Sequence, residues 1–112
     1  MVENRLDATF HALADPTRRG MLANLALGEK SIGELAQPFE MSFAGASKHV
    51  KVLEEAGLIS RRKAGRTHLI TIDAKPLEEA ERWMRRWEKF WTNRLDRLEA
   101  LIERDKKEND IG

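Results

Sequence analysis

The chain has 112 residues, of which 41% are hydrophobic and 35% are charged, and its formal net charge is +1. This length suits one domain with a modest core, and the composition is that of a soluble globular protein. Cysteine is absent, which excludes disulfides, thiolate nucleophiles and cysteine-based zinc sites. No apolar run is long enough to cross a bilayer, and residues 1–10 lack the apolar segment of a signal peptide, so a cytoplasmic protein is expected.

Two helices are predicted before Gly28. Leu6 and Phe10 begin an apolar stripe at helical spacing, which predicts a first helix over residues 4–14. Asp15 is a good N-cap and is followed by proline, which is favoured at the first helical position. A second helix is therefore predicted to begin directly after Asp15 and to end at Gly28.

The order of a helix-turn-helix is predicted next. Ser31 and Glu34 match a capping box, in which each side chain satisfies an open backbone amide, so a short helix is predicted over residues 32–37. Residues 38–42 begin with proline and form the expected turn to a longer helix over residues 43–56.

The helix over residues 43–56 is predicted to be amphipathic. Ser42 is a good N-cap for it, and Gly57 is a good residue to end it. Ala46, Val50 and Leu53 form the predicted buried stripe. The opposite face comprises Ala44, Ser47, Lys48 and Lys51. Such a small, then basic face suits the major groove of DNA, although an ordinary amphipathic helix with solvated lysines is the alternative.

A basic β-hairpin is predicted directly after this helix. Residues 59–62 and 67–72 are rich in β-branched side chains, and Gly65 between them can adopt the positive φ of a tight turn. The cations at or beside the tip, which could reach phosphates or the minor groove, are Arg61, Arg62, Lys63 and Arg66. A helix followed by a basic hairpin predicts a winged helix-turn-helix, mainly α with a small β-hairpin wing.

The charge is distributed unevenly along the chain. Residues 42–72 hold six Lys and Arg against two Asp and Glu, whereas residues 1–41 hold four against six and residues 73–112 hold ten against eleven. The basic excess is therefore confined to the predicted helix and hairpin. A local basic patch is what a specific DNA footprint requires.

Three motifs resemble the ArsR/SmtB family of winged-helix repressors: ADPTR at residues 14–18, IGELA at residues 32–36 and SKHVKVLEEAGLI at residues 47–59. The resemblance implies a homodimeric, cytoplasmic repressor that binds double-stranded DNA at an operator with imperfect two-fold symmetry. The positions that match the family's recognition helix and wing, and to which the resemblance assigns DNA contacts, are Ser42, Phe43, Ser47, Lys48, His49, Lys51, Arg61, Arg62, Lys63 and Arg66.

Two of these positions have alternative interpretations. Phe43 replaces the polar residue that is common at this position of the family, and it contacts either a thymine methyl group or the flank of the buried stripe. His49 lies off the outermost face of the predicted helix, so both a phosphate contact and a structural hydrogen bond are open.

No metal site or other cofactor is predicted. Metal-sensing members of the family carry a Cys-x-Cys pair in the third helix, where this chain has no cysteine. Other members bind zinc through the last helix, but residues 76–112 contain no histidine. His11, His49 and His68 show no metal-ligand spacing. Enzymatic activity is not expected either, because no phosphate-binding loop and no nucleophile–base arrangement is present.

The last segment is predicted to be one long helix from Pro76 to about Lys107. A helix of this length cannot bury its apolar stripe on a small domain, so we expect it to pair with its copy, together with the first helix. The predicted organisation is a DNA-binding domain over residues 1–75 and a dimerisation helix with a frayed charged tail over residues 76–112. The predicted dimer interface comprises Leu6, Phe10, Met84, Trp87, Trp91, Leu95 and Leu98.

The last helix and the basic surface each allow another function. The aromatic cluster of Trp83, Trp87, Phe90 and Trp91 is alternatively a pocket for an aromatic or lipid-like small-molecule effector. Glutamates interleaved with its basic residues argue against a helix lying on a membrane. The alternative to a DNA-binding regulator is a winged-helix protein-interaction module, whose basic face meets an acidic partner.

Overall fold

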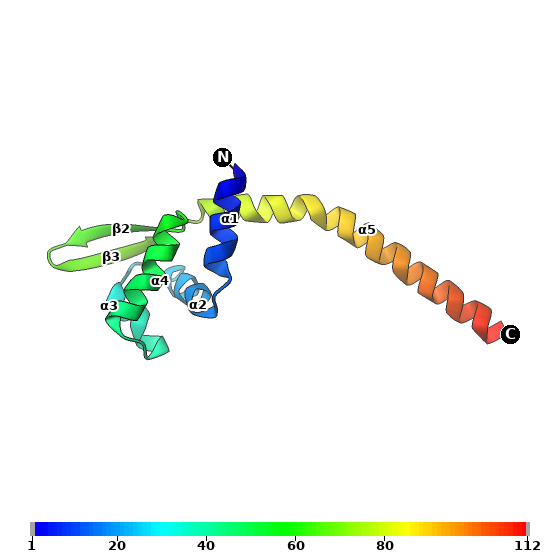
Figure 1. The fold of residues 1–112 in the computed structure, drawn as a ribbon, viewed down its shortest axis with the longest axis horizontal. Coiled ribbons are helices and arrows are strands. Elements are labelled where there is room, and N and C mark those ends of the chain that lie inside the picture. Colours follow the sequence, from blue (N-terminus) through cyan, green and yellow to red (C-terminus); the bar gives the residue numbers. More distant parts are fainter. Residues whose placement is uncertain (1, 112) are drawn as a thin grey trace. The chain divides into compact units, whose positions relative to one another are not determined.

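The structure is a computed structural model that describes the backbone of residues 2–111 and the side chains of residues 5–107. The chain forms two compact units, Met1–Ala80 and Glu81–Gly112. The elements of the first unit are α1 (Val2–Leu13), α2 (Pro16–Leu25), β1 (Lys30–Ser31), α3 (Ile32–Ala36), the 3-10 turn η1 (Gln37–Phe39), α4 (Phe43–Glu55), β2 (Ile59–Ala64) and β3 (Thr67–Ile72) (Figure 1). The helix α5 (Lys75–Ile111) begins in the first unit and makes up the second.

The predicted helix starts are confirmed by capping hydrogen bonds. The Asp15 carboxylate accepts from the backbone N–H of Arg18 at 3.0 Å and caps α2. Ser31 and Glu34 form the predicted capping box at the start of α3. Each of these bonds satisfies a backbone amide that has no partner inside its helix, which is why the helices begin where they do.

The core of the first unit lies between the helices and one face of the sheet. α4 contacts α1, α2, α3 and β2, and it buries its predicted stripe of Ala46, Val50 and Leu53. The other buried core residues are Ala12, Met21, Leu22, Leu25, Ile32, Leu35, Ala36, Leu58, Ile59 and Ile70. Gly57 follows α4 with φ of +75°, a conformation that lets the chain leave the helix toward β2 without a Cβ clash.

The wing, which we define as the β2–β3 hairpin, belongs to a three-stranded antiparallel sheet of order β1-β3-β2. The prediction of a hairpin alone was incomplete, because Lys30 and Ser31 of β1 pair with Ile70 and Leu69 of β3. A strand of two residues has no periodicity that a sequence could reveal. The wing projects from the helices of its unit (Figure 1), and Gly65 begins its tight turn with φ of +63°.

The second unit consists of the greater part of α5, a single helix without a core of its own. Its apolar side chains are consequently exposed, among them Met84 at 49%, Trp91 at 57% and Leu98 at 54%. In the part of the chain that the structure describes, no helix is long and apolar enough to span a membrane.

Candidate nucleic-acid interface

The first turn of α4 presents a small, mostly apolar surface. The hydroxyl of Ser42 accepts a hydrogen bond from the Gly45 backbone N–H at 3.0 Å and caps the helix. Ala44 is exposed. Phe43, at the first helical position, is 62% exposed. Most of the Phe43 side chain is therefore not packed against the flank of the buried stripe. The exposed part of the ring is available to a ligand.

Basic side chains follow on the same exposed side of α4. Lys48 and Lys51 are exposed, and Ser47 is partly buried beside them. The helical period places these residues on the face opposite the core, because they lie about half a turn from the buried stripe. The exposed side of α4 thus carries small and polar side chains near its N-terminus and positively charged side chains further along.

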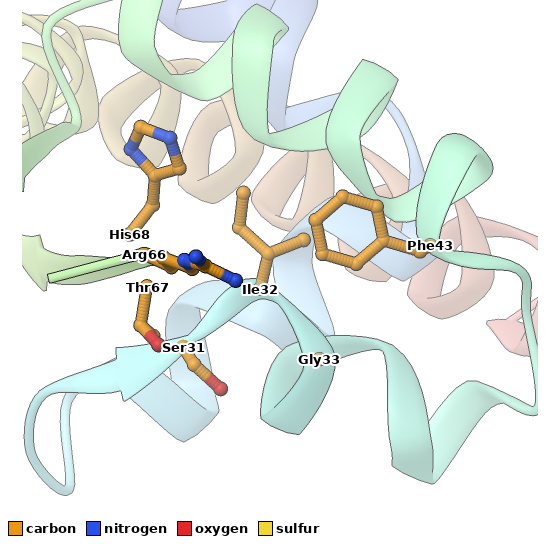
Figure 2. Close-up of a pocket in the computed structure, with 7 residues that line it drawn as sticks. All are labelled: Ser31, Ile32, Gly33, Phe43, Arg66, Thr67 and His68. Atoms are coloured by element: carbon orange, nitrogen blue, oxygen red, sulfur yellow. The ribbon is translucent and has the colours of Figure 1, made fainter. Parts of the chain in front are cut away.

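A hollow of about 180 Å³ lies beside Phe43, between the starts of α3 and α4 and the base of the wing turn. Figure 2 shows the Phe43 ring directed toward Ile32, with Arg66 and His68 contributed by the wing. The hollow is lined by Ser31, Ile32, Gly33, Phe43, Arg66, Thr67 and His68. Nδ1 of His68 is buried and finds no hydrogen-bond partner among the described side chains. The start of α4 and the wing therefore form one continuous surface.

His49 is held by a hydrogen bond within the protein. Nη1 of Arg18 lies 3.2 Å from Nδ1 of His49, and the carboxylate of Asp15 lies 3.9 Å from the same nitrogen. The hydrogen bond from the Arg18 backbone N–H, together with the nearby His49 and Arg18 side chains, lowers the pKa of Asp15. Of the two predicted roles of His49, the contact present in the structure is the structural one.

Arg18 is a site residue that sequence reasoning did not single out. Nε of Arg18 donates to the Ala12 carbonyl at 2.7 Å, and Nη2 donates to the His11 carbonyl at 3.0 Å. These carbonyls belong to the last turn of α1, where i+4 helical partners are missing, and that of His11 also accepts from the Ala14 backbone N–H at 3.2 Å. The only signal in the sequence was the ADPTR motif, in which Arg18 is the last residue.

Two of the four predicted wing cations are paired with carboxylates. Arg61 donates to Glu54 of α4 from Nε at 3.1 Å. Arg62 forms a bidentate pair with Glu29, with distances of 3.0 Å from Nε and 2.8 Å from Nη2. The hydrogen bond with Glu29 raises the pKa of Arg62 above the usual value for an arginine. The carboxylates occupy part of each guanidinium and offset its charge, so these two arginines attract phosphate less strongly than unpaired cations do.

The remaining cations of the two elements are unpaired. Within residues 5–107, no ion pair or hydrogen bond involves the side chains of Lys48, Lys51, Lys63 and Arg66, and all four residues are exposed. Unpaired cations keep their full attraction for phosphate, because no internal carboxylate has to be displaced. The exposed side of α4 and the tip of the wing consequently form a basic surface.

The predicted dimer residues occupy different environments. On α1, Leu6 is only 7% exposed and Phe10 is partly buried, so Leu6 offers little surface for a partner. The α5 residues of the prediction are all exposed: Met84, Trp87, Trp91, Leu95 and Leu98. The α5 stripe therefore holds most of the uncovered apolar surface.

The aromatic side chains of α5 pack on one another along the helix. The ring centroids of Trp83 and Trp87 lie 6.1 Å apart, and those of Phe90 and Trp91 lie 5.6 Å apart. A groove of about 490 Å³ is lined by Trp83, Met84, Trp87, Glu88 and Trp91, all of them from this one helix. A groove formed by one helix lacks the opposing wall that encloses a small ligand.

Among the residues that the structure describes, no three His, Asp or Glu side chains cluster in a way that could hold a metal ion. The three histidines lie on α1, α4 and β3. The geometry of the first unit instead defines a winged helix-turn-helix with a basic surface on α4 and the wing. Comparisons with known proteins agree with this class.

The profile of a helix-turn-helix domain family matches residues 13–62. The HTH-type transcriptional regulator Rv2034 of Mycobacterium tuberculosis is 35% identical over 97 residues, which are 87% of this chain and 88% of that protein. The transcriptional repressor SdpR of Bacillus subtilis is 30% identical over 79 residues, covering 70% of this chain and 88% of that protein. The crystal structure of an ArsR family transcriptional regulator is similar with a TM-score of 0.75 and 37% identity, over 80% of this chain and 93% of that one.

The chain belongs to the ArsR family of transcriptional regulators. It is accordingly a DNA-binding regulator and not an enzyme. The winged helix-turn-helix predicted from the sequence is confirmed by these relatives and by the fold.

Proposed function

We propose that the protein is a homodimeric repressor that binds a two-fold-related operator through α4 and the wing. The observation that carries this proposal is the set of unpaired, exposed cations on these two elements, Lys48, Lys51, Lys63 and Arg66. In this proposal α4 enters the major groove and the wing lies against the flanking backbone or minor groove. Repression is supported by the similarity to a named repressor, SdpR.

The proposed DNA contacts divide into two kinds. Ser42, Phe43 and Ser47 lie where α4 would meet base edges, whereas Lys48, Lys51, Lys63 and Arg66 would neutralise phosphates. Arg61 and Arg62 would join the phosphate contacts with their remaining N–H donors or after releasing Glu54 and Glu29. His49 acts through its bond to Arg18, which holds α4 against α1 and α2.

We propose that residues 1–75 bind DNA and that the helix over residues 76–112 builds the dimer, with Phe10 of α1 contributing. The support is the exposed stripe of Met84, Trp87, Trp91, Leu95 and Leu98. Burying one large apolar side chain contributes roughly 1.5–3 kcal/mol, so this stripe in two copies supplies a large favourable term. Two-fold symmetry would place the recognition helices about 34 Å apart, one turn of DNA.

The aromatic cluster is assigned to the same dimer interface rather than to an effector. Trp83, Trp87 and Trp91 line a groove whose walls come from one helix, so a second helix is the partner that would complete it. A small-molecule effector at this cluster would have to compete with that helix. Aromatic or lipid-like compounds that dissociate the dimer would support the effector interpretation.

The proposed function is tested by measuring binding of the full-length protein to fragments of its own promoter region and to random duplex at two salt concentrations. We expect saturable, sequence-selective binding that weakens with salt through counterion release. Lys48→Ala should weaken binding to every sequence and reduce the salt slope by about one. Lys106→Ala, which removes an exposed cation near the end of α5, is the matched control and should leave both unchanged.

The protein-interaction alternative predicts a different outcome. An intact dimer that prefers no promoter fragment over random duplex would leave the basic surface without its proposed role. That result would favour an acidic protein partner.

A further inference from the structure

We infer that Phe43 contacts the methyl group of a thymine in the major groove of each operator half-site, and that it is a specificity-determining residue. This inference rests on the proposed function, because it concerns the same α4 surface. It adds a base identity that the basic residues cannot supply, since phosphate contacts carry no sequence information directly.

The chemistry of the first turn of α4 limits which base features it can recognise. Residues 43–46 are Phe, Ala, Gly and Ala, so the turn has no side-chain hydrogen-bond donor or acceptor. The flanking hydroxyls belong to Ser42 and Ser47, and that of Ser42 accepts the Gly45 backbone N–H at 3.0 Å. The thymine methyl is the apolar group that a base pair presents in the major groove, and alanine and phenylalanine are side chains that contact it.

The Phe43 ring is both accessible and positioned. It is 62% exposed, so most of its surface is available to a ligand. Its ring is directed toward Ile32 at the edge of the hollow between α3, α4 and the wing (Figure 2). One side of the ring thus has neighbours within the protein, while the exposed remainder is free to exclude water from a methyl group.

The position of Phe43 on α4 also suits this role. Phe43 is the first residue of the helix, and Ser47 lies one turn later on the same side. The N-terminal residues of a recognition helix are those that approach base edges in helix-turn-helix proteins. An apolar contact from Phe43 next to a polar contact from Ser47 would distinguish a thymine from its neighbour.

The test uses the full-length protein and the promoter fragment that it binds most tightly. Each thymine of one half-site is replaced in turn by deoxyuridine, which lacks only the 5-methyl group. We expect one replacement to weaken binding about fourfold, the factor that corresponds to burying one methyl-sized group. Phe43→Ala should abolish this difference between thymine and deoxyuridine, and Phe43→Leu should preserve part of it.

Two further variants separate the methyl contact from a general loss of affinity. Lys48→Ala should weaken binding to both DNAs and leave their ratio at about fourfold, because it removes a phosphate contact. Ala44→Ser should also leave the ratio unchanged if Phe43 alone makes the contact. The melting temperature of Phe43→Ala should stay near that of the wild type, since the side chain is mostly exposed.

If the protein binds its operator selectively but no replacement of a thymine by deoxyuridine weakens binding, this inference is wrong and the proposed function stands. A methyl dependence that persists in Phe43→Ala would overturn it as well. Absence of selective binding to any fragment would instead overturn the proposed function, and the inference with it.

Discussion

Arg18 of α2 donates a hydrogen bond from Nη1 to Nδ1 of His49 on α4, across 3.2 Å and between residues 31 positions apart. The same guanidinium donates to the carbonyls of Ala12 and His11 at the end of α1. One side chain thereby joins three helices. It links the proposed recognition helix to α1, which we propose contributes to the dimer.

Arg18→Lys should therefore disturb both stability and DNA binding. A lysine keeps the charge but cannot reproduce the planar fork of donors that reaches three acceptors. We expect the free energy of unfolding to fall by about 1.5–3 kcal/mol, the range for hydrogen bonds to a charged group, in urea titrations at neutral pH. Operator affinity should fall as well, because α4 is less firmly placed.

Arg19→Lys is the matched control for this prediction. Arg19 donates one hydrogen bond, from Nη1 to the Leu13 carbonyl at 2.7 Å, and is exposed. Its replacement should lower the free energy of unfolding by less than about 1 kcal/mol. Equal effects of the two variants would mean that the additional hydrogen bonds of Arg18, including the one to His49, contribute nothing.

Glu29→Gln should strengthen DNA binding. Glu29 holds Arg62 of the wing through two hydrogen bonds between residues 33 positions apart. Removing the carboxylate charge frees the guanidinium for phosphate and removes a negative charge beside the DNA. We expect operator affinity to rise severalfold and the salt slope to steepen by up to about one, as measured by fluorescence anisotropy at several salt concentrations.

A double-mutant cycle distinguishes release of Arg62 from simple loss of a negative charge. If Glu29 acts by holding Arg62, the gain from Glu29→Gln should disappear in an Arg62→Ala background. The same gain in both backgrounds would show that Glu29 repels DNA directly. Arg62→Ala alone should weaken binding to all sequences, and unchanged affinity and salt slope would exclude the proposed phosphate contact.

Trp91→Ala should loosen the dimer before it affects DNA binding. Trp91 is 57% exposed on α5 and is packed against Phe90, so the wild-type chain leaves most of this ring for a partner. Truncating a buried aromatic side chain removes roughly 3 kcal/mol or more of packing. We expect the dimer dissociation constant to rise at least tenfold in sedimentation experiments, with operator binding recovered at high protein concentration.

Lys89→Ala provides the comparison for Trp91→Ala, because Lys89 is an exposed charged residue of the same helix segment. Its dimer dissociation constant should change little. An unaltered dimer in Trp91→Ala would remove Trp91 from the proposed interface.

Glu34→Gln should lower stability at neutral pH and not at acid pH. Hydrogen bonds from the Ser31 backbone N–H and hydroxyl hold the pKa of Glu34 below the usual value for a glutamate. A carboxylate whose pKa is lowered by folding stabilises the native state above its unfolded pKa, and this contribution is lost as the pH falls through the folded pKa. The melting temperatures of wild type and variant should therefore differ at pH 7 and converge as the pH falls through the lowered pKa of Glu34.

Glu40→Gln serves as the control for this pH series. The Glu40 carboxylate makes no hydrogen bond or ion pair with any described side chain, and its removal should not produce the same convergence. A melting-temperature difference for Glu34→Gln that is as large at pH 3 as at pH 7 would contradict the capping-box explanation.

Local physical chemistry within the sequence determined the helices and the basic surface of this protein. Asp15, Ser31 and Ser42 cap the helices that follow them, because each needs only an amide three residues further along the chain. The spacing of Ala46, Val50 and Leu53 determined which face of α4 is buried, and therefore which face carries Lys48 and Lys51. These features depend on neighbouring residues alone.

The tertiary structure decided which of the predicted site residues are free. Arg61 and Arg62 look alike in the sequence as wing cations, but alternation along β2 turns one toward Glu54 of α4 and the other toward Glu29. The Arg62–Glu29 pair, the pairing of β1 with β3 and the bond between Arg18 and His49 each join residues more than 30 positions apart. Such contacts form only when the core brings distant elements together, because no local pattern encodes the partner of a charged side chain.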